Sequence, residues 1–270
     1  MPTTAIRRSR WVAPKGRINF TPRDLEICKL LTPHALVRYP WSYAYLPTRY
    51  FAPLLKTGAF YTPNRLAQLR SAGYVTLPDQ PRNNFRDLIY QLGKAGASEV
   101  RELGYQFELV PRALAHELGS CLLAADFELG ARKYALPLDI ISIPDLTKLP
   151  DWPIFTLAGH VVLLEFDTGS ESQNVIEGKY ECYLGLIEER RVRAPIFLFV
   201  TTKRDRVSNL IRTLKGTIDR HEFPYSHAQY FAFGHMTYDR FLNKLPEPSG
   251  WVVTYPFERA GYPPFSFHQA

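Results

Sequence analysis

The chain has 270 residues, of which 46% are hydrophobic, 14% aromatic and 22% charged. This composition is typical of a globular protein with an apolar core, and it excludes a disordered, collagen-like or coiled-coil chain. Three widely separated cysteines without a C-x-x-C pair exclude a disulfide framework, so we expect a reducing, cytoplasmic setting. The apolar runs are far shorter than the roughly 18 residues that a membrane helix needs, so no membrane association is expected.

The net charge of +7 is concentrated near the N-terminus. Residues 1–96 hold 15 Lys and Arg against 4 Asp and Glu, a net charge of +11, whereas residues 97–270 carry a net charge of −4. A segregated positive charge attracts polyanions, so this division predicts two domains, the first of which faces a phosphate backbone. The alternative is a basic tail beside ordinary surface charge.

The first 17 residues are predicted to form a flexible basic arm. They hold a single large aromatic residue, Trp11, and cannot bury enough surface to order themselves. A helix is expected over 22–32, where Thr21 stands at the capping position and Pro22 at the first helical position.

Two more helices are expected in the N-terminal segment. The second lies within 41–52, broken by Pro47 and ended by Pro53. The third begins at Thr62 and ends at Gly73, with leucines on one side and polar residues on the other.

Two strands, at 74–77 and 88–92, are expected to follow and to be joined by a basic turn. Three helices and a basic β-hairpin are typical of the winged-helix variant of helix-turn-helix, whose third helix enters the major groove of DNA. The alternative is a small helical domain used for protein contacts, but the charge of +11 favours DNA. The residues predicted to contact DNA lie on the arm, the third helix and the hairpin turn: Arg7, Arg8, Arg10, Arg17, Arg65, Gln68, Arg70, Arg82, Asn83 and Arg86.

The rest of the chain alternates between helical spacing and continuous apolar runs. The expected order is a helix at 116–133, strands at 138–143, 154–157 and 161–166, a helix at 171–190, a strand at 194–201, a helix at 206–220 and a strand at 230–233. This order predicts an α/β domain with a mixed sheet.

Candidate catalytic groups are concentrated in one stretch. Glu165 and Asp167 are two residues apart on one strand and therefore share a face, Asp151 precedes the strand before it, and Lys179 lies in the following helix. Carboxylate oxygens are the ligands that Mg²⁺ requires, so we predict Asp151, Glu165 and Asp167 as metal ligands, with Lys179 orienting the nucleophile or steadying charge on a phosphate. The alternative is a structural ion network around Lys179.

The acidic strand is part of a longer motif, Leu164-Glu165-Phe166-Asp167-Thr168-Gly169-Ser170-Glu171, with Pro150-Asp151 ahead of it and Lys179 and Tyr183 behind it. With this motif the chain resembles the replication-relaxation proteins of plasmids and other mobile elements, over most of residues 20–235. The resemblance implies a winged helix followed by a restriction-endonuclease-like domain, whose signature is P-D and then D/E-x-K. Here Asp167 stands at the lysine position of that signature, and Lys179 would take the place of the lysine. The resemblance also implies a role in plasmid replication or DNA relaxation.

Other chemistries lack their signatures. No histidine stands in H-E-x-x-H or at zinc spacing with cysteines, so no zinc is expected. The absence of G-x-x-x-x-G-K-[ST], G-x-G-x-x-G and G-x-S-x-G argues against a nucleotide cofactor and against an α/β-hydrolase. Tyr105, Tyr180 and Tyr183 have no histidine triad nearby in sequence and are expected to be packing residues.

We therefore expect a basic arm at 1–17, a winged-helix DNA-binding domain at 18–97, a restriction-endonuclease-like α/β domain at 98–242 and a Pro- and aromatic-rich tail at 243–270. Two functions are consistent with this organisation. The first is a DNA-binding accessory or initiation protein of a mobile element, which binds double-stranded DNA as a homodimer and recruits a replication or transfer protein. The second is a Mg²⁺-dependent endonuclease that cuts or nicks near its bound site.

Overall fold

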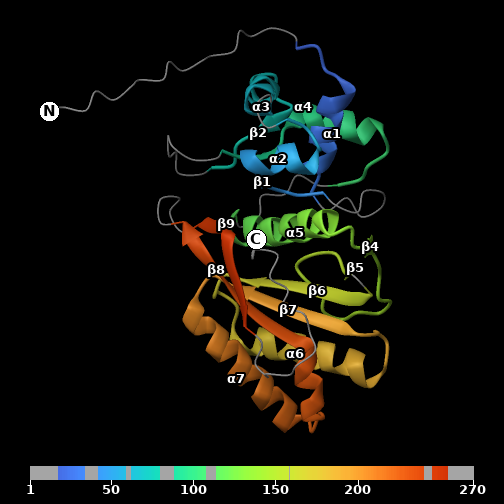
Figure 1. The fold of residues 1–270 in the computed structure, drawn as a ribbon, viewed down its shortest axis with the longest axis vertical. Helices are drawn as coiled ribbons and strands as arrows, with labels where there is room; N and C mark the ends of the chain where they lie inside the picture. The colour runs from blue at the N-terminus through green and yellow to red at the C-terminus, as the bar shows by residue number, and fades with distance from the viewer. Residues whose placement is uncertain are drawn as a thin grey trace, which may run out of the picture.

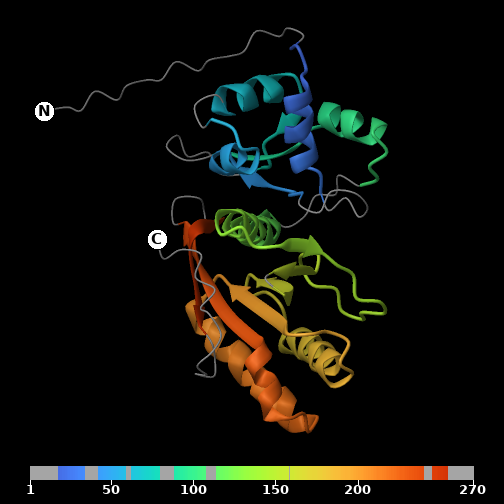
Figure 2. The same ribbon diagram turned by 45° about the vertical axis from the view of Figure 1, so that its right-hand side comes forward.

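The chain forms two sheets, with a long helix between them. The computed structural model describes residues 18–33, 42–58, 62–79, 88–107, 114–157, 159–239 and 245–254. Figure 1 and Figure 2 show the N-terminal helices on one side of α5 and the larger sheet on its other side. The mixed α/β class expected from the sequence is confirmed. No helix in these described ranges is long and apolar enough to cross a membrane.

In its described residues, the N-terminal segment combines four helices with a small antiparallel sheet. Strand β3 is the central strand and pairs with β1 on one side and with β2 on the other. The hairpin predicted after the third helix is therefore present as β2 and β3. In chain order the elements are α1 (Pro22–Leu30), β1 (Leu46–Pro47), α2 (Thr48–Leu54), α3 (Thr62–Ser71), β2 (Val75–Thr76), β3 (Ile89–Leu92) and α4 (Lys94–Glu102).

The second helix differs from its prediction because of its two prolines. Pro47 does not break a helix but ends β1, where it pairs with Ile89, and α2 begins directly after it. Pro53 lies inside the last turn of α2 and does not end it. Proline lacks an N–H, which a short edge strand tolerates. At Pro53 the missing N–H removes one hydrogen bond to the carbonyl four residues earlier, and α2 ends one residue later.

Helix α4 was not expected, and the predicted domain boundary between residues 97 and 98 falls inside it. Its sequence holds a glycine and only one large apolar residue, Val100, so the helical spacing is hard to read. Two glycines, Gly93 at the N-cap and Gly96 inside the helix, permit its close packing against the preceding backbone. A Cβ at Gly93 would lie 2.2 Å from the carbonyl oxygen of Gly73, and one at Gly96 would lie 2.3 Å from that of Tyr74.

The C-terminal segment is a six-stranded mixed sheet with helices on both faces. The strand order is β4-β5-β6-β7-β8-β9, in which β6, β7 and β8 are parallel and the other neighbours are antiparallel. Helix α5 packs on one face and α6 and α7 pack on the other. The elements are α5 (Leu114–Lys133), β4 (Leu138–Ile140), β5 (Phe155–Leu157), β6 (His160–Asp167), α6 (Gln173–Glu188), β7 (Pro195–Thr201), α7 (Arg204–Arg220), a 3₁₀ turn (Tyr225–Tyr230), β8 (Phe231–Asp239) and β9 (Leu245–Thr254).

The C-terminal region expected as a tail contains a strand. Residues 243–270 were assigned to a Pro- and aromatic-rich tail, but Leu245–Thr254 form β9, which pairs antiparallel with β8 at the edge of the sheet. The two prolines of β9 obscured the strand in the sequence. An edge strand tolerates proline because one side of its backbone makes no ladder hydrogen bonds.

Helix α5 joins the two halves of the molecule. Its central residues are buried among side chains of both, so that one apolar cluster runs from α1 through α5 to β6. Polar contacts add to this packing, since the Tyr50 hydroxyl donates to Asp126 over 2.8 Å and the Tyr43 hydroxyl donates to Glu128. Arg132 also donates to the carbonyl oxygen of Leu54 over 2.6 Å. The N-terminal segment is therefore docked on the helix that covers the larger sheet.

The contact between α5 and the sheet requires a glycine. A Cβ at Gly119 would lie 2.1 Å from two ring atoms of the buried Phe166 on β6. We expect Gly119→Ala to lower the free energy of unfolding by about 1–3 kcal/mol, because overpacking forces a buried side chain or the backbone to shift. Denaturant unfolding measures this. Gly185→Ala on α6 is the control, since nothing lies within 4 Å of its Cβ position; equal effects at both helical glycines would contradict the prediction.

Candidate functional site

The predicted catalytic residues gather at the carboxyl end of β6. Glu165 and Asp167 project from the same face of the strand, as expected, toward α6 and α7. Both carboxylates are almost fully buried, with 1% and 2% of their surface exposed. Each is met by a cation from a different helix, Lys179 of α6 and Arg206 of α7.

Lys179 is the central cation of the site. Its ammonium donates to Glu165 over 2.7 Å and to Glu171 over 2.9 Å, and the side chain is buried. Burial lowers the pKa of Lys179, but the negative charges of Glu165 and Asp151 more than offset this and raise it. The lysine is therefore held as a cation between carboxylates and does not point into solvent.

Glu165 has partners at both carboxylate oxygens. Lys179 binds Oε2, and the hydroxyl of the buried Tyr183 donates to Oε1. Burial raises the pKa of Glu165 to about 8, and the negative charge of Asp151 adds to the shift, while Lys179 and Tyr183 oppose it. Asp151 lies beside the same part of β6, since its Oδ2 accepts from the N–H of Phe166, the residue after Glu165.

Asp151 is fixed beside β6 by backbone contacts. Its N–H donates to the carbonyl of Leu164 over 3.1 Å, and its Oδ2 accepts from the N–H of Phe166 over 2.8 Å. The same oxygen lies 3.3 Å from Nε2 of His116, near the start of α5. Burial alone would raise the pKa of Asp151, but the hydrogen bond from His116 and the charge of Lys179 lower it. The same hydrogen bond raises the pKa of His116.

Asp167 has a different set of partners. Its Oδ2 accepts from Nε of Arg206 over 2.7 Å, and its Oδ1 accepts from the N–H of Gly169 over 2.6 Å. Arg206 also donates to the carbonyl oxygen of Glu171, which links the two ion pairs. Because Arg206 of α7 binds one oxygen and the backbone of Gly169 binds the other, Asp167 shares neither partner with Asp151 or Glu165.

Asp151 and Glu165 supply carboxylate oxygens, which are the ligand type that a hard divalent ion takes. Mg²⁺ is commonly held by one or two carboxylates, with water and substrate phosphate completing its coordination. Within the described ranges, no group of three or more His, Cys, Asp or Glu side chains is arranged as a complete metal cage. The prediction of a metal held by Asp151, Glu165 and Asp167 therefore stays a prediction.

Residues 43–196 match the sequence profile of the replication-relaxation family. The matched range contains α5, β6 and α6, which carry the site. The chain belongs to the replication-relaxation family. This confirms the resemblance carried by the acidic motif, and membership suggests a role in the replication or relaxation of mobile elements. No curated protein matches the chain, and no solved structure does.

The predicted DNA contacts of this replication-relaxation protein are only partly described. Arg65 on α3 donates to the buried Asp24 of α1, to Gln68 and to the carbonyl oxygen of Asn19, so its guanidinium is turned toward its own domain. Arg70, at the end of α3, is exposed and lines a cavity of about 660 Å³ at the base of the hairpin. Seven further predicted contacts lie outside the described residues: Arg7, Arg8, Arg10, Arg17, Arg82, Asn83 and Arg86.

The Asp24–Arg65 pair gives a test of pH dependence. Burial alone would raise the pKa of Asp24, but hydrogen bonds from Arg65 and Thr21 lower it below 3.8. A lowered folded pKa means that the stabilisation is present above the unfolded pKa and is lost as the pH falls through the folded value. We expect Asp24→Asn to cost about 1–3 kcal/mol at pH 7 and less at pH 3, measured by urea unfolding. A cost that does not change with pH would contradict this.

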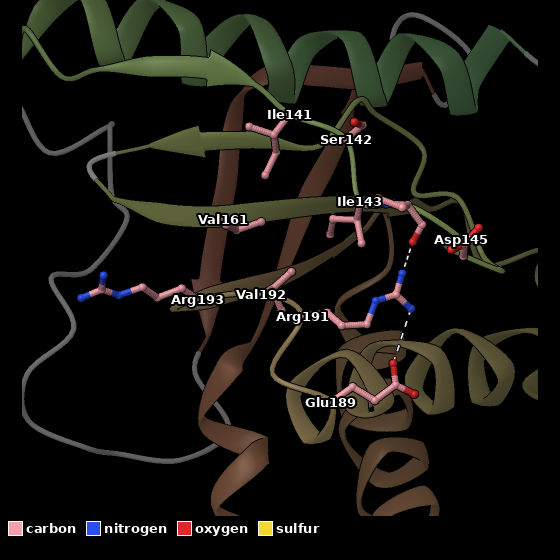
Figure 3. A pocket seen from close by; sticks show the side chains of 10 residues that line it. Ile141, Ser142, Ile143, Asp145, Val161, Glu189, Arg191, Val192 and Arg193 are labelled. Carbon is pink, nitrogen blue, oxygen red and sulfur yellow. Dashed lines mark hydrogen bonds and ion pairs between the residues drawn. The ribbon is translucent and has the colours of Figure 1, made fainter.

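A second cavity of about 520 Å³ lies at the other end of β6, beside Val161. Figure 3 shows Arg191 directed toward Glu189 and toward the loop that holds Pro144, whereas Arg193 points away. None of the predicted site residues lines this cavity. In this family member the cavity is therefore separate from the carboxylate site.

Four side chains of the site were not among the site residues predicted from the sequence. They are His116, Glu171, Tyr183 and Arg206, which contact Asp151, Lys179, Glu165 and Asp167 respectively. Two of them had a signal in the sequence, because Glu171 ends the acidic motif and Tyr183 lies one helical turn beyond Lys179. His116 and Arg206 had none, since they reach the site from α5 and α7 through the tertiary fold.

Proposed function

We propose that this protein is a DNA-binding accessory or initiation protein of a plasmid or mobile element, and that its N-terminal segment docks on double-stranded DNA as a winged helix. The element order α1-β1-α2-α3-β2-β3 and the sheet order β1-β3-β2 support this proposal. The main support is the net charge of +11 on residues 1–96, because a concentrated positive charge attracts the phosphate backbone of DNA. Helix α3 would enter the major groove, and the hairpin turn would touch the adjacent backbone.

The larger sheet is proposed to be a restriction-endonuclease-like domain that serves as a platform for a replication or transfer protein. The run α5-β4-β5-β6-α6-β7, with three antiparallel strands followed by a parallel one, supports this proposal. A homodimer would place two such platforms at paired half-sites, since winged-helix proteins commonly read DNA in this way.

Fluorescence anisotropy with a labelled DNA duplex tests the first proposal. We expect Arg82→Ala and Arg86→Ala in the hairpin turn to weaken duplex binding, whereas Arg193→Ala, an exposed cation at the start of β7, should not. If the N-terminal segment serves protein contacts, the wild-type protein will show no duplex binding. The stoichiometry at saturation reports whether a dimer binds.

A second candidate function is Mg²⁺-dependent DNA cleavage. The observation that favours it is the buried Lys179, which lies within electrostatic reach of both Asp151 and Glu165. Those two carboxylates would hold the ion, and the ion would supply a Lewis acid and an activated water. Lys179 would steady negative charge on the phosphate, and Tyr183 keeps the Glu165 carboxylate oriented.

Incubation with supercoiled plasmid, with Mg²⁺ or with chelator, distinguishes the two functions. An endonuclease nicks the plasmid only with metal, and Asp151→Asn abolishes nicking while duplex binding persists. An accessory protein shifts the plasmid on a gel without cutting it. His221→Leu, at an exposed histidine beyond α7, is a matched control that should leave either outcome unchanged.

A further inference from the structure

The carboxylate site has a contributor from outside the acidic motif. His116 lies near the start of α5, on the face of the sheet opposite to α6 and α7, and its Nε2 is 3.3 Å from Oδ2 of Asp151. Its ring also meets that of Phe166 edge to face, with the centroids 6.0 Å apart. The imidazole is therefore held by packing as well as by Asp151, with about a quarter of its side chain exposed.

The contacts of Asp151 show what His116 adds. Oδ2 already accepts from the N–H of Phe166, so the carboxylate is held at one oxygen by the backbone of β6 and by the imidazole together. The backbone hydrogen bond and the ion pair with His116 meet at one oxygen and together restrain the Asp151 side chain. Glu165 is oriented in a comparable way by Tyr183.

We propose that His116 is a positioning residue of a divalent-cation site formed by Asp151 and Glu165, holding Asp151 in the orientation in which it binds the ion. The inference rests on the second proposed function in one respect: Asp151 and Glu165 must bind a metal ion. Hydrogen bonds to metal-binding carboxylates tune the site, and their loss typically costs 10- to 100-fold in metal affinity. Helix α5 would then have two roles. Its Asp126 and Glu128 bind tyrosines of the N-terminal segment, and its His116 positions the metal-binding carboxylate of Asp151.

Mn²⁺ binding to the full chain, followed by the electron paramagnetic resonance signal of the free ion, tests this directly. We expect His116→Leu to weaken Mn²⁺ binding roughly 10- to 100-fold. His116→Gln retains an N–H donor and should bind close to wild type. The matched control is His221→Leu. His221 also pairs with a carboxylate, that of Glu181 at 3.0 Å, but it lies directly after the last residue of α7.

The outcomes separate the inference from the function on which it rests. If the wild type binds no more Mn²⁺ than Asp151→Asn does, the metal site is absent and both ideas are overturned. If Asp151→Asn loses binding but His116→Leu binds as well as wild type, only the role of His116 is overturned. A loss in His116→Leu that is accompanied by unfolding without metal, or a loss that His116→Gln shares, also overturns it. A loss confined to the folded His116→Leu variant supports it.

Discussion

We expect Lys179→Met to lower the free energy of unfolding by about 3–5 kcal/mol, because removing the cation of a buried pair leaves the buried carboxyl group of Glu165 without its ammonium partner. The carboxylate left behind is that of Glu165, which is 1% exposed and would keep only the Tyr183 hydroxyl as a partner. Glu171 would contribute less, since about a quarter of its side chain is exposed and can turn to water. Urea unfolding followed by circular dichroism measures the difference.

Two further variants show that the cost comes from the ion pair. Glu165→Gln combined with Lys179→Met removes both charges and should regain much of the lost stability, since a matched apolar or neutral replacement of a buried pair is often close to neutral. Lys148→Met replaces an exposed lysine and should change stability by less than about 0.5 kcal/mol. If Lys179→Met is no more damaging than Lys148→Met, the ion network does not stabilise the fold.

We also expect duplex DNA affinity to fall about 10³-fold between 50 and 200 mM salt. The arm and the hairpin turn supply six arginines, and six phosphate contacts give a slope of about −5 in a plot of log affinity against log salt. Each contact releases condensed counterions from the DNA, so the slope reports the number of phosphate contacts. Anisotropy titrations at four or five salt concentrations give the slope.

Neutralising the arm isolates its share of this slope. Replacing its four arginines, Arg7, Arg8, Arg10 and Arg17, by glutamine should reduce the magnitude of the slope by about 3–4. The matched control replaces four exposed arginines of the C-terminal segment, Arg190, Arg193, Arg204 and Arg212, and should leave the slope unchanged. A flat salt response of the wild type would count against DNA as the partner.

Most elements could be predicted from local sequence. The helices α1, α3, α5, α6 and α7 and the strands β5, β6 and β7 lie where apolar spacing or continuous apolar runs placed them. The prediction failed where proline or glycine dominated the local signal, at α2, α4 and β9. In each case tertiary packing or sheet pairing, which no local window contains, outweighed the residue preference.

The acidic motif defined half of the site. The spacing of Glu165 and Asp167 put them on one face of a strand, and the register of α6 brought Lys179 back to the same edge. The spacing could not show that Glu165 pairs with Lys179 and Asp167 with Arg206, because Arg206 comes from a separate helix.

The segregation of charge, the alternation of helices and strands, and the acidic motif of the replication-relaxation family are properties of neighbouring residues, so they could be predicted without the fold. Two features could not be predicted in this way: α5 packs against both segments, and His116 lies 3.3 Å from Asp151, more than thirty residues further along the chain. Contacts between distant segments depend on how the elements pack, so the spacing of each residue from its own neighbours carries no signal of them.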